Sequence, residues 1–182
     1  MNFGIIGAGK IGTYHIRDFL KNGWVLKGII TSNIITAEKT ALEIKEKYGI
    51  IVNFYDNLDD LLRRNNIDTI IISSPTETHY DFIIKCINNN VNIFCEKPFI
   101  YNINENNTIR CKELLSLIES TNLKLGVNTQ WVYGINQLKY SLPKNITHVE
   151  LYMEHYKTKN DISFFVENIC HMNSIIIFLF GL

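Results

Sequence analysis

The sequence has no excess of either charge, because 18 lysine and arginine residues balance 18 aspartate and glutamate residues. A binding surface for nucleic acid or for an acidic membrane needs an excess of positive charge, so this balance argues against both partners. The sequence also has no apolar run close to the roughly 18 residues of a membrane span. We therefore expect no nucleic acid and no membrane among its partners, but a small-molecule substrate or a second copy of the chain.

Cysteine is scarce, and its spacing carries no chemical signature. No C-x-x-C pair occurs, and no cluster of histidine, cysteine and aspartate has the spacing of metal ligands. The four cysteines are Cys86, Cys95, Cys111 and Cys170. The chain begins with strand-like residues and not with a signal peptide. These features predict a reducing, cytoplasmic setting and no metal site.

The N-terminal residues combine an apolar strand, a glycine-rich turn and a helix. The strand runs into the motif Gly7-Ala8-Gly9-Lys10-Ile11-Gly12, which has the pattern G-x-G-x-x-G. In such a motif the first glycine makes a tight turn, the second lets the backbone approach a pyrophosphate, and the third lets the helix pack on the strand. The free N–H groups at the helix start favour an anion. We predict that the backbone from Gly7 to Gly12 binds a dinucleotide.

Strand-like and helix-like segments alternate along the rest of the first 125 residues. This alternation predicts an α/β fold, a Rossmann doubly wound parallel sheet, over residues 1–125. The expected helices cover residues 37–48, 58–65, 80–87 and 104–121, and the expected strands after the first cover residues 24–30, 51–54, 68–73, 92–95 and 123–128. Residues 126–182 are expected to form a truncated α+β segment.

The end of the second strand bears on the choice of cofactor. An acidic residue about 20 positions after the glycines hydrogen-bonds the ribose of NAD in this fold. Here the residues are Thr31, Ser32 and Asn33. No carboxylate repels a 2′-phosphate, and the hydroxyls could donate to one, although no arginine is there to clamp it. The residues at this strand end therefore favour NADP over NAD as the cofactor.

Two further segments, both expected at carboxyl ends of strands, indicate a family. The first runs from Ser73 to His79 and ends in T-x-x-H, and the second is Glu96-Lys97-Pro98. With the glycine motif, these segments resemble the glucose–fructose oxidoreductase, inositol dehydrogenase and MocA family (Gfo/Idh/MocA) over residues 1–182. Residues 126–131 and 167–171 look like two later motifs of that family. They depart from it at Gln130, Glu167 and Ile169, where the family often has arginine, usually has aspartate and often has glycine. A further departure follows at Ser174, where an aspartate commonly comes after the histidine.

The resemblance implies a nicotinamide-dependent oxidation of a secondary alcohol, or reduction of the ketone, on a sugar, cyclitol or nucleotide sugar. Lys97 would stabilise negative charge on the reacting oxygen. His171 would accept the hydroxyl proton, and Glu167, one helical turn earlier, would orient His171 or bind substrate. Pro98 would follow a cis peptide. The residues implied to contact the cofactor, besides the glycine motif and the end of the second strand, are Ser74, Pro75, Thr76, His79, Glu96, Lys97 and Asn128.

Each of these roles has a plainer alternative. Lys97 taken alone is a solvated surface lysine, and His171 lies in a strongly apolar stretch where a core histidine is the competing interpretation. His79 fits the start of a helix, where it would hydrogen-bond the backbone. At the level of the protein, a non-catalytic dinucleotide-binding regulator, or a decayed paralogue without a substrate domain, is the alternative to an NAD(P)-dependent oxidoreductase.

The C-terminal part holds one expected strand, residues 147–156, and one apolar helix, residues 163–180. The strand alternates apolar residues such as Val149 and Leu151 with polar neighbours, but a single strand has no partner within this short segment. The helix is apolar over more than one stripe. We therefore expect a homodimer in which residues 147–156 and 163–180 are buried between two copies.

Overall fold

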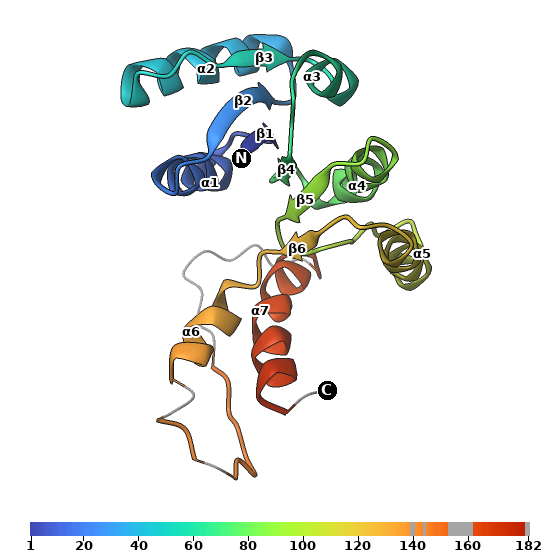
Figure 1. Cartoon of the computed structure of the whole chain (residues 1–182). Helices are drawn as coiled ribbons and strands as arrows, with labels where there is room; N and C mark the ends of the chain where they lie inside the picture. The colour runs from blue at the N-terminus through green and yellow to red at the C-terminus, as the bar shows by residue number, and fades with distance from the viewer. Residues whose placement is uncertain (139–140, 144, 153–161, 181–182) are drawn as a thin grey trace. The chain divides into compact units, whose positions relative to one another are not determined.

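The computed structural model describes residues 1–138, 141–143, 145–152 and 162–180 (Figure 1). The chain divides into two compact units, Met1–Val127 and Asn128–Leu182. Each unit is described by itself.

The first unit is built on a sheet of six parallel strands. The strands are β1 (Asn2–Ile6), β2 (Val25–Ile30), β3 (Asn53–Tyr55), β4 (Thr69–Ile72), β5 (Asn92–Cys95) and β6 (Leu125–Val127). They lie in the order β3-β2-β1-β4-β5-β6 (Figure 1). From β1 the chain first adds strands toward β3, and then returns to the other side of β1 with β4. This order is that of a doubly wound Rossmann sheet and confirms the predicted fold class.

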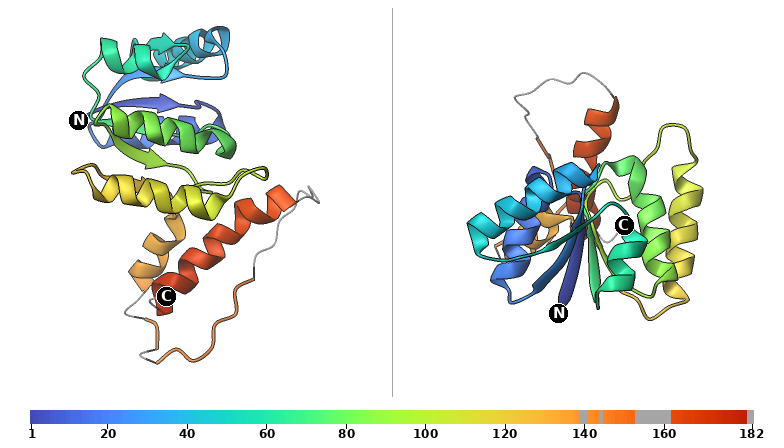
Figure 2. Two further views of the ribbon diagram at one scale, coloured as in Figure 1. Left: turned by 90° about the vertical axis from the view of Figure 1, so that its right-hand side faces the viewer. Right: turned by 90° about the horizontal axis from the view of Figure 1, so that it is seen from above.

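Helices cover both faces of this sheet. They are α1 (Lys10–Lys21), α2 (Ile34–Tyr48), α3 (Leu58–Arg64), α4 (His79–Asn88) and α5 (Asn107–Glu119), with a short 3₁₀ turn η1 (Thr76–Thr78) before α4. Figure 2 shows α1 and α2 on one face and α4 and α5 on the other. Asparagine begins three of these helices, because the side chains of Asn33, Asn57 and Asn106 each accept a hydrogen bond from a backbone N–H three residues later.

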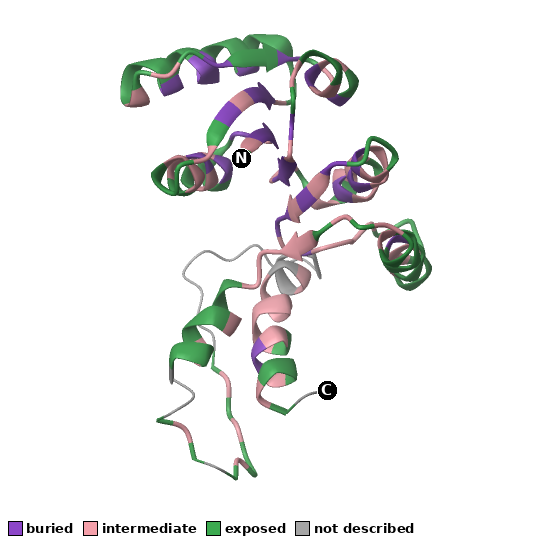
Figure 3. Ribbon diagram, viewed as in Figure 1, coloured by how far each residue is buried: buried purple, intermediate pink, exposed green. Residues whose placement is uncertain are grey.

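The two faces of the sheet have separate apolar cores, and β1 contributes to both. Phe3 and Ile5 pack with Ile16 of α1 and Ile44 of α2, whereas Ile6 packs on the opposite side with residues of α3 and α4. As a result β4 is buried along its whole length, and β1 along all but its first residue, as Figure 3 shows. Continuous burial explains why β4 reads as an uninterrupted apolar sequence and not as an alternating one.

The second unit contains two helices among its described residues, α6 (Gln130–Leu138) and α7 (Ile162–Phe180). The apolar helix predicted over residues 163–180 is confirmed, whereas α6 was not predicted. The strand predicted over residues 147–156 is wrong for residues 147–152, which have no regular secondary structure. Residues 153–156 lie outside the described residues. Alternation alone could not form a strand here, because the part of this unit that the structure describes offers no strand for it to pair with.

Candidate functional site

The candidate site lies at the carboxyl ends of three neighbouring strands. Gly7 follows β1, Ser73 and Ser74 follow β4, and Glu96 and Lys97 follow β5. Because β4 pairs with both β1 and β5 in parallel, these segments meet at one edge of the sheet. The strand order reverses between β1 and β4, and open α/β sheets bind ligands at such a switch point.

Gly7 is fixed by the close approach of two strand ends. Its φ is +86°, and a Cβ at this position would lie 2.5 Å from the carbonyl oxygen of Ser73 and 2.5 Å from the amide nitrogen of Ser74. The Ser73 hydroxyl donates a hydrogen bond to the Gly7 carbonyl. Only glycine fits here, both for its left-handed backbone and for lack of space.

Gly12 and Gly9 face very different surroundings. A Cβ on Gly12 would collide with the backbone carbonyl of Gly7 and would lie 2.9 Å from the Ser73 Oγ, whereas a Cβ on Gly9 would meet nothing within 4 Å. Gly12 is therefore required for packing. Gly9 borders open space, and its φ of −70° is one that any residue can adopt.

Open space at Gly9 adjoins the start of α1. Gly9 is the N-cap of this helix, no side chain caps it, and its first turn has no acidic residue. The side chains of Lys10 and Ile11 are exposed there. The first-turn N–H groups of a helix are not satisfied within it and carry a partial positive charge. A cradle that a Cβ would fill, next to an uncapped helix start, fits the pyrophosphate of a dinucleotide.

At the end of β2, part of the polar set is engaged within the chain. The Thr31 hydroxyl donates to the Asn33 carbonyl at 2.9 Å, and the Asn33 side-chain oxygen accepts from the Thr36 N–H at 2.9 Å as the cap of α2. Ser32 is exposed. Of the three residues predicted to contact the cofactor here, Ser32 is the one whose hydroxyl stands at the surface beside the start of α2.

The segment after β4 is held by its own hydrogen bonds and by His79. The Ser74 hydroxyl lies 2.7 Å from the Thr78 hydroxyl. His79 is 1% exposed, and its Nε2 lies 2.9 Å from the Ser74 carbonyl oxygen while its Nδ1 lies 3.1 Å from the Pro98 carbonyl oxygen. This side chain therefore links the segments that follow β4 and β5. Pro75 is exposed and Thr76 half-buried on the same segment.

Glu96 and Lys97 follow β5, and the peptide between Lys97 and Pro98 is cis. Glu96 is 8% exposed, and its Oε1 lies 2.6 Å from Nε2 of His15 on α1. Its Oε2 accepts a hydrogen bond from the Lys97 backbone N–H at 3.1 Å. Sequence reasoning did not single out His15. Its position three residues after Gly12, on the side of α1 that approaches the sheet, is the signal that could have identified it.

The remaining predicted site residues belong to the second unit. Asn128 is its first residue and is half-buried. His171 lies on α7, half-buried, with its ring 6.4 Å from that of Trp131 on α6 in an edge-to-face arrangement. Glu167 precedes His171 by four residues on α7, so their Cα atoms lie one helical turn apart.

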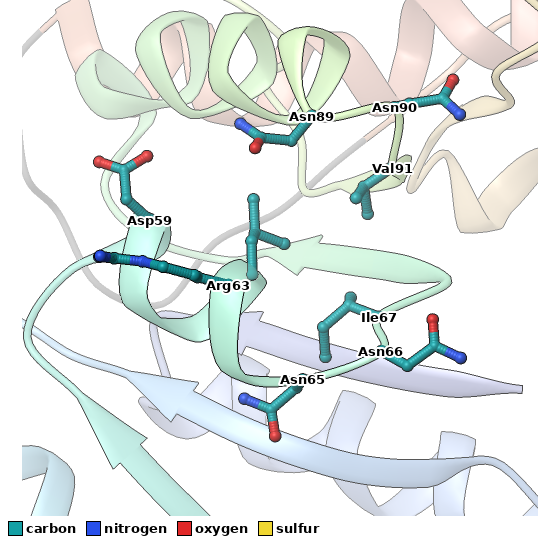
Figure 4. Close-up of a pocket in the computed structure, with 9 residues that line it drawn as sticks. Asp59, Arg63, Asn65, Asn66, Ile67, Asn89, Asn90 and Val91 are labelled. Atoms are coloured by element: carbon teal, nitrogen blue, oxygen red, sulfur yellow. The ribbon is translucent and has the colours of Figure 1, made fainter.

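Elsewhere the described residues form a further hollow and contain a buried cysteine, but neither lies at the glycine motif. A hollow of about 540 Å³ lies at the amino ends of β4 and β5, opposite the glycine motif, and is lined by α3 and residues 65–67 and 89–91 (Figure 4). No group of three potential metal ligands occurs in the described part of the chain. Within that part, no helix has the length and apolar character needed to cross a membrane. Burial raises the pKa of the Cys86 thiol to about 12.

The glycine cradle at a switch point of a parallel sheet defines a dinucleotide-binding Rossmann unit. The chain belongs to the Gfo/Idh/MocA family, since a family model described as "Oxidoreductase family, NAD-binding Rossmann fold" matches residues 1–129. This match confirms the resemblance inferred from the sequence motifs.

Individual relatives match part of the chain. A myo-inositol 2-dehydrogenase of Thermotoga maritima is 31% identical over 103 residues, which cover 57% of this chain and 30% of that protein. The UDP-N-acetylglucosamine 3-dehydrogenase of Acidithiobacillus ferrooxidans gives a TM-score of 0.64 at 23% identity, over 78% of this chain and 43% of that one. GenD2 from gentamicin A biosynthesis, solved in complex with NAD, gives 0.62 at 16% identity, over 73% and 35%. This chain thus spans less than half the length of each.

Proposed function

We propose that the protein is an NAD(P)-dependent oxidoreductase that interconverts a secondary alcohol and its ketone on a sugar, cyclitol or nucleotide sugar. The observation that carries the proposal is the open cradle at Gly9, beside the uncapped start of α1 and on the same edge of the sheet as Lys97. The cradle supplies a place for the cofactor, and the lysine supplies a cation near the end of an adjacent strand.

The cofactor would be held by the chain's backbone and by small polar side chains. Its pyrophosphate would lie against residues 9–12, and the bed for its nicotinamide would be formed by Ser74, Pro75, Thr76 and Glu96. A bound nicotinamide dinucleotide supplies the acceptor or donor of a hydride. His79 is buried, with Nε2 2.9 Å from the Ser74 carbonyl oxygen and Nδ1 3.1 Å from the Pro98 carbonyl oxygen, and it supports this bed from between the two segments.

Lys97 and His171 are proposed to act on the reacting hydroxyl group. The Lys97 ammonium would stabilise the negative charge that develops on the oxygen, an effect worth several kcal/mol in a site from which water is excluded. His171 would take the hydroxyl proton during oxidation, because imidazole titrates near neutral pH. Glu167 is proposed to orient His171 or to contact the substrate.

The substrate class is supported by what the relatives act on. One is a myo-inositol 2-dehydrogenase and another a UDP-N-acetylglucosamine 3-dehydrogenase, so a cyclitol and a nucleotide sugar are the first compounds to test. For the cofactor we propose NADP over NAD. The exposed Ser32 and the absence of a carboxylate among residues 31–33 support this preference, because a carboxylate would repel a 2′-phosphate.

The test combines binding with turnover. Calorimetry should show that the chain binds NADPH more tightly than NADH. A spectrophotometric assay with myo-inositol, UDP-N-acetylglucosamine and related polyols should then show reduction of the oxidised cofactor. Lys97→Met should lower kcat by about 100-fold or more while the dissociation constant of the cofactor changes by less than about threefold, because the lysine acts on the transition state and not on the phosphates.

Three results would contradict the proposal in different ways. No binding of either dinucleotide would refute the cofactor site. Binding without turnover of any alcohol in the panel would favour the alternative, a non-catalytic dinucleotide-binding protein. Full activity in Lys97→Met would refute the role of the lysine.

A further inference from the structure

The glycine-motif helix and the end of β5 are joined by one buried side-chain pair. His15 of α1 and Glu96 are 81 residues apart in the sequence, and His15 Nε2 donates to Glu96 Oε1 at 2.6 Å. The side chains are only 13% and 10% exposed. A carboxylate removed from water to this extent needs a directed partner, and charge-assisted hydrogen bonds are among the stronger polar contacts in proteins.

The two carboxylate oxygens of Glu96 accept hydrogen bonds from two different partners. One accepts from His15, and the other accepts from the Lys97 backbone N–H at 3.1 Å. Two directed hydrogen bonds to separate oxygens leave a carboxylate little rotational freedom. The orientation of the Glu96 carboxylate therefore affects the backbone of the residue proposed to act on the substrate.

His15 is itself fixed by packing. Its ring lies 5.4 Å from the Phe94 ring at 83°, an edge-to-face contact with a residue of β5. Gly12 and Ile16, on either side of His15 along α1, are buried. The imidazole is thus placed by β5 and by α1 together, and not by its bond to Glu96 alone.

We propose that His15 is a positioning residue for Lys97, which acts by orienting the Glu96 carboxylate. This inference rests on the proposed function for its effect on turnover, but its structural part can be tested without turnover. Loss of the hydrogen-bond donor at position 15 changes the position and surroundings of the Lys97 side chain and leaves the glycine cradle intact. A hydrogen-bond donor of similar reach at position 15 restores the position of Lys97.

The test uses the full chain with its lysines reductively methylated with ¹³C-formaldehyde, so that each lysine gives an NMR signal. Lys97→Arg assigns the signal of Lys97. His15→Leu keeps bulk against Phe94 but donates no hydrogen bond, and His15→Gln donates through its side-chain amide. The matched control is Arg17→Ala, which removes an exposed ion pair with Asp18 from the same helix.

We expect the Lys97 signal to shift in His15→Leu, and to return toward the wild-type position in His15→Gln. It should not move in Arg17→Ala. His15→Ala serves as the second variant without a donor if the leucine variant does not fold. In the turnover assay, the donor-free variant should lose on the order of 10- to 100-fold in kcat, as small displacements of catalytic groups do, with KM for the dinucleotide within about twofold.

The two ideas fail in different ways. An unchanged Lys97 signal in the donor-free variant, or a glutamine variant that behaves like it, overturns the role of His15 whether or not the protein turns over any substrate. A chain that binds no dinucleotide refutes the proposed function, while the Lys97 signal still decides whether His15 positions the lysine.

Discussion

Substitution of Gly9 by alanine separates binding from folding more cleanly than any other change in the glycine motif. The Gly9 backbone has φ −70° and ψ −163°, which alanine adopts without strain, and its Cβ would meet nothing within 4 Å. As an N-cap, alanine is less favourable than glycine by about 0.5–1 kcal/mol. Alanine also lowers the conformational entropy of the unfolded chain, which stabilises the folded state by about 0.4–1 kcal/mol and offsets the loss. The free energy of unfolding should change by less than about 1 kcal/mol.

The effect of Gly9→Ala on binding should be much larger. The added methyl group occupies the space in which a pyrophosphate would approach the first turn of α1. Moving the phosphates outward would lose about two charge-assisted hydrogen bonds to backbone N–H groups, each worth about 1.5–3 kcal/mol. Because about 1.4 kcal/mol corresponds to a tenfold change in affinity, the dissociation constant should rise by about 100-fold or more.

Thermal unfolding with and without cofactor measures both effects on one sample. With NADPH at about 100 times its dissociation constant, wild type gains about 2.7 kcal/mol, whereas a variant that binds 100-fold more weakly gains about 0.4 kcal/mol. For a chain of this size these gains correspond to rises in Tm of about 5–10 °C and about 1 °C. Gly134→Ala, which adds a methyl group to an open position inside α6, is the matched control; it should raise the Tm of the free chain slightly and keep the wild-type rise on adding cofactor.

Two outcomes would refute this reasoning. If Gly9→Ala kept the wild-type rise in Tm, the pyrophosphate would not lie against Gly9. If the variant failed to fold, the space beside Gly9 would not be open.

Four further predictions follow from other residues. Ser32→Asp should weaken binding of NADPH by about tenfold relative to NADH in calorimetry, because a carboxylate repels the 2′-phosphate; an unchanged ratio would argue against Ser32 as a contact. His171→Asn should remove the limb of the pH–rate profile near neutrality, and an unaltered profile would exclude His171 as the base. Burial raises the pKa of Cys86 to about 12 from 9.0, so the unfolded chain loses this proton first and stability falls as pH rises above 9, by up to about 1.4 kcal/mol per pH unit. The free energy of unfolding, measured with urea between pH 9 and 11, should fall less steeply with pH in Cys86→Ala than in wild type. An equal dependence on pH would contradict the raised pKa of Cys86. The predicted homodimer now depends on α7, where Ile177 is 52% exposed; light scattering should show a dimer that Ile177→Lys weakens, and a monomeric wild type would refute it.

Much of the first unit could be predicted because its signals are local. The apolar strand, three glycines and amphipathic helix at the N-terminus stand next to one another in the sequence. β5 follows an Asn-rich turn and covers the residues predicted for it, Asn92–Cys95. The expected helix over 104–121 is shorter, Asn107–Glu119, because the Asn106 side chain caps the helix start and so begins the helix later than apolar periodicity indicates.

The features that sequence reasoning missed depend on distant contacts. The pairing of His15 with Glu96 joins residues 81 positions apart, so helical spacing could place His15 on the side of α1 that approaches the sheet but could not give its partner. The contact of His79 with the cofactor stays a prediction; its side chain is buried, with Nε2 2.9 Å from the Ser74 carbonyl oxygen and Nδ1 3.1 Å from the Pro98 carbonyl oxygen, close to the plainer alternative of a backbone hydrogen bond. The strand expected over residues 147–156 failed for residues 147–152 because alternation reports a possible buried face and not the presence of a partner.

The unequal surroundings of the motif glycines affect how such a motif would change during evolution. Gly7 and Gly12 are held by contacts within the chain itself, so mutations there would be removed by selection for folding even in a descendant that had stopped binding cofactor. Gly9 has no such contact, so only selection for ligand binding would keep it free of a side chain. The presence of the first and third glycines in a related sequence therefore indicates the fold but not cofactor binding. Substitution of the second glycine would be the first sign in the sequence that cofactor binding had been lost.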